Sequence, residues 1–374
     1  MKYYIIAGEA SGDLHGSNLM RSIYKKDPEA EIRFWGGDLM QQVGGKLVKH
    51  YKDLAFMGFV EVVQNLGTIL RNIKFCKKDI ASFNPDVLVF IDYPGFNMRI
   101  AKWAKKIGIE THYYISPQIW AWKENRINDI KRDFDFMYVI LPFEKDFYEK
   151  KHNYPVTFVG HPLIDAIANY RAQEHEDFRK KHNLDDRPVI ALLPGSRKQE
   201  ISRLLNEMLS VIHHYPQYQF VIAGAPGQEA SFYETFIKDQ NISFVFNETY
   251  ALLNIAHAAL VTSGTATLET ALFSVPQVVL YKGNQMSYEI AKRIIKLKYI
   301  SLVNLIMDDD VVVELIQGDC NAVRIEQEFA KIIQGEKRNE IMLKYKELIR
   351  NLGGQGASDY VADEIIKNHM TKRS

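Results

Sequence analysis

One carboxylate stands where a parallel sheet would present it to a ligand. The run Val87–Ile91 is wholly apolar, and Asp92 follows it directly, ahead of Tyr93 and the pair Pro94-Gly95. Ligands of open α/β sheets bind beyond the carboxyl ends of the strands, so Asp92 could accept a proton there as a general base. An aspartate before Pro-Gly is also typical of a turn or a cap. The residue types alone leave both interpretations open.

Two segments in the second half could hold a diphosphate. The turn Gly195, Ser196 and Arg197 follows an apolar run and precedes a helical pattern, so a guanidinium with its fork of donors lies beside free backbone amides. The segment 262–269 is a similar junction, where small residues lead into the positive end of a helix. Glu269 lies one helical turn into this segment and could accept hydrogen bonds from ribose hydroxyls. Ordinary helix caps with a surface arginine and an exposed glutamate are the alternative.

Three weaker candidates lie elsewhere. The segment Gly8–Asp13 after the first apolar run offers flexible backbone and free amides to a polar ligand, or else forms a tight turn with an aspartate cap. His161 ends the last strand expected in the first half, near the expected cleft, although a single loop histidine is more often structural. Asp308–Asp310 has the composition of a metal site but fits better as a cap at the start of a helix.

The segment Phe56–Leu70 is apolar and amphipathic, and a basic flank follows it at Arg71, Lys74, Lys77 and Lys78. Such a segment could lie against an anionic membrane or admit acyl chains. Packing of a helix against the first sheet would explain most of the same side chains. The residues that would contact lipid are Phe56, Met57, Phe59, Val63, Leu66 and Leu70.

These residues need a scaffold of alternating strands and helices. Short β-branched and aromatic runs alternate with longer amphipathic stretches, which is typical of βα units and parallel sheets. We expect a first domain over 1–165, a polar linker, a second domain over 188–350, and a closing helix over 351–374 that packs back on the first domain. Beyond Asp310 the pattern is almost wholly helical through Lys367, with a break at 353–356. The expected strands are 3–7, 32–35, 87–92, 111–115, 136–141, 157–160, 189–193, 220–223, 243–246, 259–262 and 277–281.

The composition excludes several classes of protein. The 47 basic and 46 acidic side chains give a net charge of +1, which provides no broad cationic field for a nucleic acid. Cys76 and Cys320 form no ligand cluster, so neither a disulfide framework nor structural zinc is expected. The opening Met1–Ala7 indicates a strand instead of a secretion signal, and no apolar run approaches the roughly 18 residues of a membrane span. We therefore expect a cytoplasmic protein.

Nine strings of this sequence together resemble the lipid-A-disaccharide synthase family. They follow one another in that family's order between Ala7 and about Leu305, and their joint occurrence is highly specific although each alone is weak. The strings are AGEASGDLHG, LAFMGFVEV, FIDYPGFN, YYISPQIWAWKENR, LPFE, FVGHPL, LLPGSR, SGTATLE and SLVNL.

The resemblance implies a GT-B glycosyltransferase, in which two Rossmann-like domains face a central cleft. It implies an inverting reaction that joins UDP-2,3-diacylglucosamine to 2,3-diacylglucosamine 1-phosphate, giving UDP and the β(1→6) disaccharide of lipid A in lipopolysaccharide synthesis. It also implies peripheral association with the inner face of the inner membrane of a Gram-negative bacterium. A homodimer is a further expectation, and no cofactor or metal is expected. The alternatives are another UDP-sugar-dependent GT-B enzyme, an epimerase, or a non-catalytic UDP-sugar-binding module.

The resemblance also assigns roles to residues. Asp92 matches the family's essential aspartate, and Arg197, Glu269 and Asn304 match its UDP-binding positions. The full set expected at the UDP site is Gly195, Ser196, Arg197, Glu200, Ser263, Gly264, Thr265, Ala266, Thr267, Glu269, Tyr281 and Asn304, and the set expected at the donor and acceptor cleft is Gly8, Glu9, Ser11, Gly12, Asp13 and His161.

Overall fold

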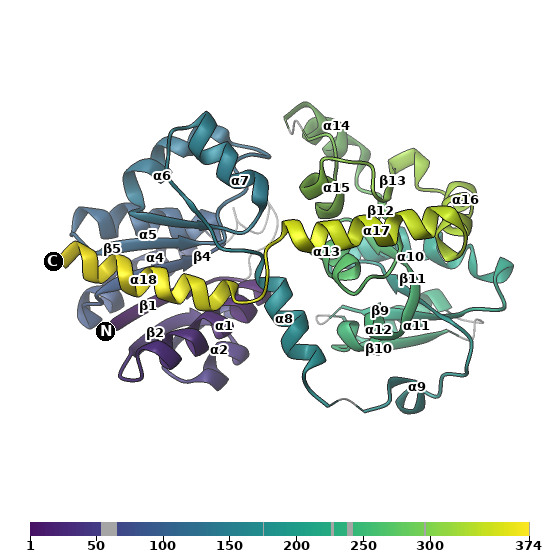
Figure 1. Cartoon of the computed structure of the whole chain (residues 1–374), viewed down its shortest axis with the longest axis horizontal. Helices are drawn as coiled ribbons and strands as arrows, with labels where there is room; N and C mark the ends of the chain where they lie inside the picture. The colour runs from purple at the N-terminus through teal and green to yellow at the C-terminus, as the bar shows by residue number, and fades with distance from the viewer. Residues whose placement is uncertain (54–65, 175, 226–227, 238–241, 295–296, 374) are drawn as a thin grey trace. The chain divides into compact units, whose positions relative to one another are not determined.

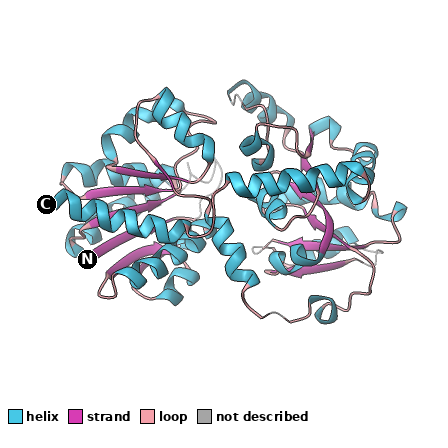
Figure 2. Ribbon diagram, in the orientation of Figure 1, coloured by secondary structure: helices cyan, strands magenta, loops and turns pink. Residues whose placement is uncertain are grey.

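The computed structural model describes the chain apart from residues 54–65, 175, 226–227, 238–241, 295–296 and 374 (Figure 1). The chain forms two compact units. Unit 1 contains Met1–Ala166 and Leu352–Ser374, and unit 2 contains Ile167–Asn351. In each unit, helices pack around a sheet whose described strands are all parallel (Figure 2). The expected α/β class with two parallel sheets is confirmed.

The described strands of unit 1 form one sheet in the spatial order β3-β2-β1-β4-β5-β6-β7. Strands β4 and β5 are buried along their whole length, as expected where helices cover both faces of a sheet. The direction of winding reverses between β1 and β4, and such a switch point is where open α/β sheets bind ligands. The strands are β1 (Lys2–Ala7), β2 (Glu31–Gly36), β3 (Lys46–His50), β4 (Val87–Ile91), β5 (Glu110–Tyr114), β6 (Phe136–Val139) and β7 (Thr157–Phe158).

Alternate residues of these strands point to opposite faces of the sheet. Tyr4, Leu88 and Phe90 pack on one face in a core with residues of α4 and α5. The last helix, α18, lies beside α1 (Figure 1), where Lys26 pairs with Asp363 at 2.5 Å. The helices are α1 (Ala10–Lys26), α2 (Asp38–Val43), α4 (Leu66–Phe83), α5 (Pro94–Lys106), α6 (Ile127–Asp133), α7 (Pro142–Asp146) and α18 (Ala357–Arg373), and α8 (Pro162–Arg171) begins in unit 1 and ends in unit 2.

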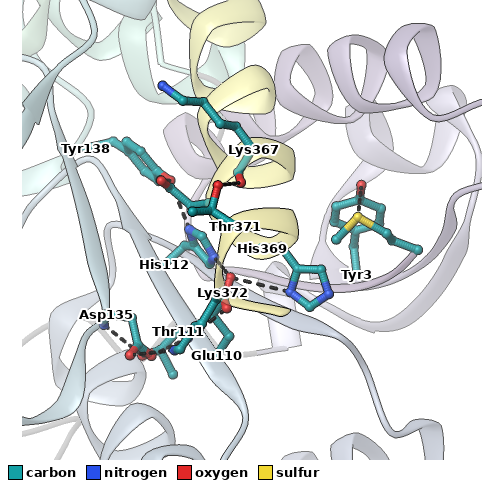
Figure 3. A network of polar contacts seen from close by, with 12 residues as sticks. Tyr3, Glu110, Thr111, His112, Asp135, Tyr138, Lys367, His369, Thr371 and Lys372 are labelled. Carbon is teal, nitrogen blue, oxygen red and sulfur yellow. Dashed lines mark hydrogen bonds and ion pairs between the residues drawn. The ribbon is translucent and has the colours of Figure 1, made fainter. Parts of the chain in front are cut away.

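A buried polar network fastens α18 to β5 and β6 (Figure 3). The ring of His112 lies 2.8 Å from Glu110 through Nε2 and 2.9 Å from the Tyr138 hydroxyl through Nδ1. His369 and Lys372 of α18 approach the same glutamate at 3.5 and 3.7 Å. Burial lowers the pKa of His112, so the ring is neutral near pH 7. The contacts of His369 and Lys372 with Glu110 help to hold the end of the chain on unit 1.

Unit 2 repeats the same winding with the described strands in the order β10-β9-β8-β11-β12-β13, and its switch point lies between β8 and β11. The strands are β8 (Val189–Leu193), β9 (Gln219–Gly224), β10 (Ser243–Phe246), β11 (Ala256–Thr262), β12 (Gln277–Tyr281) and β13 (Val313–Ile316). The helices are α9 (Phe178–Lys181), α10 (Lys198–Leu209), α11 (Ala230–Ile237), α12 (Thr249–Ile255), α13 (Thr265–Leu272), α14 (Gln285–Ile294), α15 (Leu302–Met307), α16 (Ala322–Ile333) and α17 (Glu336–Asn351).

The sequence missed the edge strands β3 and β13, and the prediction of an almost wholly helical stretch beyond Asp310 is wrong at β13. β3 is short and only partly buried, and its lysines and histidine interrupt any apolar run. β13 lies in the apolar stretch 311–316, which Glu314 alone interrupts, and such a short stretch fits a helix as well as a strand. The expected helix start at Asp308–Asp310 is also wrong, because Asp308 ends α15 in the left-handed conformation (φ +46°) and β13 follows. Within the described residues, the helices are too short or too polar to cross a membrane.

Candidate functional site

The carboxyl ends of β8, β9 and β11 surround a pocket of about 300 Å³ in unit 2, a volume within the range of small-molecule sites. It lies at the switch point, between the turns that follow β8 and β11. Eight of the residues expected at the UDP site contribute to its wall. The lining residues are Leu193, Gly195, Ser196, Glu200, Ala223, Gly224, Ala225, Thr249, Thr262, Ser263, Gly264, Thr265, Ala266 and Glu269.

Two helices begin at this pocket, α10 after Arg197 and α13 after Gly264. Gly195 (φ +109°) and Gly264 (φ +154°) adopt backbone conformations that side chains disfavour, which explains glycine in both turns. The N-cap of α13 has no side chain to bond the first amides of the helix. Free amides and the positive end of the helix dipole together attract an anion. This end of the pocket is therefore suited to a diphosphate.

Glu269 is held by a residue that the sequence analysis missed. The Tyr250 hydroxyl donates a 2.9 Å hydrogen bond to Glu269 Oε1. Burial raises the pKa of the Glu269 carboxyl, and this hydrogen bond partly opposes the rise. The second oxygen remains available to a hydroxyl donor, which agrees with the expected contact to ribose. No sequence signal pointed to Tyr250, because it reaches Glu269 from another helix.

Arg197 lies at the rim and does not line the pocket. Its side chain is 68% exposed, and its Nη1 lies 3.6 Å from Oε1 of Glu200. The other oxygen of Glu200 accepts the backbone amide of Arg197 at 3.4 Å. The guanidinium is thus oriented by a residue of the wall but remains open to solvent and to a ligand.

Thr267, Ser263 and Tyr281, which were also expected to contact UDP, have side-chain contacts within the protein, and so does Asn304. Thr267 is buried and donates to the carbonyl of Gly264. Ser263 donates to the carbonyl of Ile300, although it also lines the pocket. Tyr281 ends β12 outside the lining, with its ring 6.3 Å from that of Tyr288.

Asn304 is 1% exposed, and its amide bonds the backbone of Val312 twice, at 3.0 and 2.8 Å, and the Glu314 carboxylate at 3.0 Å. Its side chain fastens α15 to β13 and lies outside the pocket.

In unit 1, Asp92 lies just beyond β4 in a strained backbone. Asp92 and Tyr93 both have left-handed conformations, with φ of +46° and +48°. Each such non-glycine residue costs on the order of 1–3 kcal/mol, and this strain is concentrated at functional sites. The carbonyl of Asp92 accepts hydrogen bonds from Asn97 Nδ2 at 2.7 Å and from the Tyr113 hydroxyl at 2.9 Å. These bonds hold the aspartate where the strand ends.

Burial and, to a smaller extent, the nearby carboxylate of Glu9 raise the pKa of Asp92 to about 6, and the amide of Tyr93 partly opposes this rise. Glu9 is the N-cap of α1, immediately after β1. The two carboxylates therefore lie across the switch point of unit 1. A pKa close to neutrality suits a general base, because the group is ionised yet basic enough to take a proton.

The remaining residues expected at the cleft have different roles. Gly8 allows the Tyr93 ring to approach, since a Cβ there would lie 2.3 Å from Tyr93 Cδ1. Gly12 packs against Ala7, and Ser11 is exposed. The buried Asp13 accepts the amides of the 37–40 turn at 2.7 to 3.0 Å, so its carboxylate caps α2.

His161 is also structural in its contacts. It is 4% exposed, and burial lowers its pKa to about 3, helped by His15. Its Nδ1 accepts the amide of Leu163, and its own amide donates to the carbonyl of Leu352. His161 thus stabilises the point at which the chain re-enters unit 1. This contact fits the structural role that was the alternative to a role in the cleft.

Glu144 is a second residue that the sequence analysis did not single out. This buried carboxylate accepts from Ser116 at 2.7 Å and from Trp120 at 3.1 Å, and the amides of Ile140 and Leu141 bond its other oxygen. It ties the loop after β5 to the end of β6. Its only sequence signal was the string LPFE.

Of the expected lipid contacts, Phe56, Met57, Phe59 and Val63 lie outside the described residues. Leu66 begins α4, and Leu70 on the same helix is 57% exposed. Within the part of the chain that the structure describes, three or more His, Cys, Asp or Glu side chains nowhere gather as a metal site would require.

Comparison with known proteins gives whole-chain matches. A model of the lipid-A-disaccharide synthetase family matches residues 3–367. The lipid-A-disaccharide synthase of Coxiella burnetii (strain CbuG_Q212) is 38% identical over 370 residues, covering 97% of each chain. That of Geobacter metallireducens is 36% identical, covering 99% of this chain and 97% of its own.

Solved structures share the fold. The UDP-GlcNAc 2-epimerase from Neisseria meningitidis, bound to UDP-GlcNAc, superposes with a TM-score of 0.70 at 14% identity, covering 98% of this chain and 100% of that one. The glycotransferase of kitacinnamycin gives 0.69 at 12% identity, covering 98% of both chains. At such identities the likeness shows the fold alone.

Proposed function

The chain belongs to the lipid-A-disaccharide synthetase family, and from this premise we propose that it joins UDP-2,3-diacylglucosamine to 2,3-diacylglucosamine 1-phosphate. The products are UDP and the β(1→6) disaccharide 1-phosphate of lipid A. The observation that carries the proposal is the strained, partly buried carboxylate of Asp92 at a switch point, with a pKa of about 6. A protein that only bound UDP-sugars would have little use for such a group.

The chemistry is one displacement with inversion. The acceptor's 6-hydroxyl oxygen forms a bond to the anomeric carbon of the donor, while the bond from that carbon to the diphosphate oxygen breaks. The hydroxyl proton passes to Asp92. An α-linked donor thereby gives a β-linked product in one step, so one base suffices.

The leaving diphosphate gains negative charge as it departs. The first turns of α10 and α13 and the guanidinium of Arg197 are the groups proposed to stabilise it. Because these groups are fixed before the reaction, their reorganisation costs little at the moment of bond breaking. Glu269, held by Tyr250, is proposed to bind the ribose hydroxyls.

The test is to incubate purified protein with both substrates and to analyse the lipid extract. The expected result is a disaccharide 1-phosphate by mass spectrometry, with a β(1→6) linkage by NMR and one UDP released for each disaccharide. An α linkage would contradict the inverting mechanism. An epimerised UDP-sugar without disaccharide would support the epimerase alternative, and UDP-sugar binding without any product would support the binding module.

We also propose that the enzyme is cytoplasmic and docks peripherally on the inner face of the inner membrane through one face of α4. Leu70 and Phe75 are 57% and 48% exposed, and Arg71, Lys74 and Lys78 are exposed on the same helix. Apolar side chains interspersed with cations suit a surface of anionic lipid. These residues start at Leu70, the last residue of the amphipathic segment defined from the sequence, and continue through its basic flank.

Partition into vesicles of phosphatidylethanolamine and phosphatidylglycerol tests the docking face. Replacing Leu70 and Phe75 with Ser should weaken partition several-fold and leave UDP affinity unchanged. Leu343→Ser in unit 2, where the side chain is 65% exposed, is the matched control. Equal partition of the double variant and the native protein would refute the docking role of α4.

A further inference from the structure

An exposed tryptophan carries two cations beyond the carboxyl end of β5. Trp122 is 44% exposed, with Lys123 Nζ 4.2 Å and Arg126 Cζ 5.6 Å from its ring centroid. Cations within about 6 Å of an indole face are attracted to it. The ring therefore gathers two positive charges at one exposed point of unit 1.

The charge of this cluster is not neutralised by the protein. Among the described residues, no carboxylate lies within ion-pair distance of Lys123 or Arg126. Glu124, which stands between them in sequence, is instead committed to Lys151 at 2.7 Å and to His152 at 2.9 Å. Two adjacent cations without a carboxylate are suited to an external anion.

The first part of the loop that carries the cluster is anchored to the end of β6. Glu144 bonds Ser116 and Trp120, and the Trp120 ring packs edge-on against Phe143 with centroids 4.9 Å apart. Ile115 has φ +64°, which is a genuine outlier for a β-branched residue, and Lys123 has φ +57°. Strain of this kind persists only where the surroundings enforce it, and it is typical of ligand sites.

The loop that carries the cluster leaves the sheet at the same carboxyl edge as Asp92. Strands β4 and β5 are parallel neighbours, and the amide of Asp92 donates to the carbonyl of Tyr114 at the end of β5. Tyr113 joins the two sites, since its hydroxyl donates to the Asp92 carbonyl at 2.9 Å. Burial raises the pKa of Tyr113, the charge of Asp92 raises it further, and the charge of Arg126 opposes the rise. The charges of Asp92 and Arg126 thus shift the pKa of the Tyr113 hydroxyl in opposite directions.

We propose that Lys123 and Arg126, displayed on Trp122, bind the phosphate of the acceptor sugar and thereby hold its 6-hydroxyl at Asp92. The inference rests on the proposed function, which supplies an acceptor with a phosphomonoester on the anomeric carbon, across the ring oxygen from the carbon that bears the attacking 6-hydroxymethyl group. A phosphomonoester carries about −1.5 to −2 charges near pH 7, and arginine binds its oxygens with a fork of donors.

The test compares two short-chain acceptors dispersed without vesicles, one with the 1-phosphate and one with a 1-methoxy group. The native protein should prefer the phosphorylated acceptor. Arg126→Gln and Lys123→Gln should each lower kcat/KM for it about tenfold or more, mainly through KM, and leave the unphosphorylated acceptor unaffected. Arg126→Lys should recover part of the loss. Lys106→Gln is the matched control, because Lys106 is an exposed cation of unit 1 at the C-terminal end of α5, whereas Asp92 lies near the N-terminal end of that helix.

Calorimetry with the phosphorylated acceptor separates this inference from the proposed function. Suppose that the native protein makes no disaccharide but that Arg126→Gln binds the phosphorylated acceptor more weakly than the native protein does. This result would refute the proposed reaction and would support the phosphate site. Equal losses with both acceptors would show a merely structural role and overturn the site. Lower UDP affinity in the variants would instead assign the cations to the donor.

A lipid headgroup is the other source of a phosphate, and vesicle partition distinguishes it. The proposal expects Arg126→Gln to partition like the native protein into vesicles containing phosphatidylglycerol. Reduced partition together with unchanged kinetics on dispersed acceptor would overturn the acceptor site.

Discussion

Replacing Asp92 with Asn should stabilise the folded protein while removing its proposed base. The folded environment raises the pKa of this carboxyl from its ordinary 3.8 to about 6. Because the folded-state pKa lies above that of the unfolded chain, its stabilising contribution is complete below pH about 4 and is lost as pH rises through about 6. At 1.36 kcal/mol per pKa unit the loss amounts to at most about 3 kcal/mol. Asn also suits the left-handed backbone of this position.

The assay is thermal unfolding of both proteins at pH 4.5 and pH 7.5. We expect the midpoint of Asp92→Asn to exceed that of the native protein by a small margin at the lower pH, where about a third of the loss has already occurred, and by several degrees at the higher pH, since about 1 kcal/mol shifts a unit of this size by roughly 2–4 °C. Asp13→Asn is the matched control. Its carboxylate bonds three backbone amides, so the same substitution should destabilise the protein at pH 7.5.

A midpoint for Asp92→Asn that is equal to or below that of the native protein at pH 7.5 would refute the reasoning. It would mean that the ionised carboxylate of Asp92 does not destabilise the folded protein. The pKa of Asp92 would then not be raised by folding and could not support its role as a general base.

The unit 2 pocket and the leaving group give three further predictions. Arg197→Ala should weaken UDP binding by about 1.5–3 kcal/mol in calorimetry, because a charge-assisted bond is lost; unchanged affinity in a folded variant would remove Arg197 from the site. Tyr250→Phe should weaken UDP binding up to about tenfold by releasing Glu269, and full affinity would show that this glutamate needs no orientation. Turnover should continue in EDTA without added metal, whereas activity that EDTA abolishes and Mg²⁺ restores would contradict the proposed stabilisation by helix ends and Arg197.

Sequence alone could predict most of what lies at the centre of each sheet. Central strands are buried on both faces, so they appear as apolar runs, and the polar residues that follow them fall at the carboxyl ends. Asp92 and the turns at Gly195 and Gly264 were singled out in this way. The edge strand β3 was missed because its polar residues break the apolar run, and β13 was missed because a short apolar stretch fits a helix as well as a strand.

Sequence could not predict which polar side chains the fold would use internally. Asp13 and Asn304 have the chemistry of ligand contacts, but their partners are backbone groups that approach only in the folded unit. The reverse holds for Tyr250, whose importance comes from its contact with Glu269 on another helix. The strain at Asp92 is likewise invisible in the sequence, since Asp is common in unstrained turns.

The transfer rate of Asp92→Asn, measured with its UDP affinity on the same sample, tests the central claim most directly. Asn keeps the size of the side chain but cannot take the proton of the acceptor hydroxyl. We predict a single-turnover rate lower by about 10²- to 10⁴-fold, with UDP affinity within a factor of two of the native value, because the pocket proposed to bind UDP is lined by residues of unit 2. A rate close to that of the native protein would contradict the assignment of Asp92 as the base.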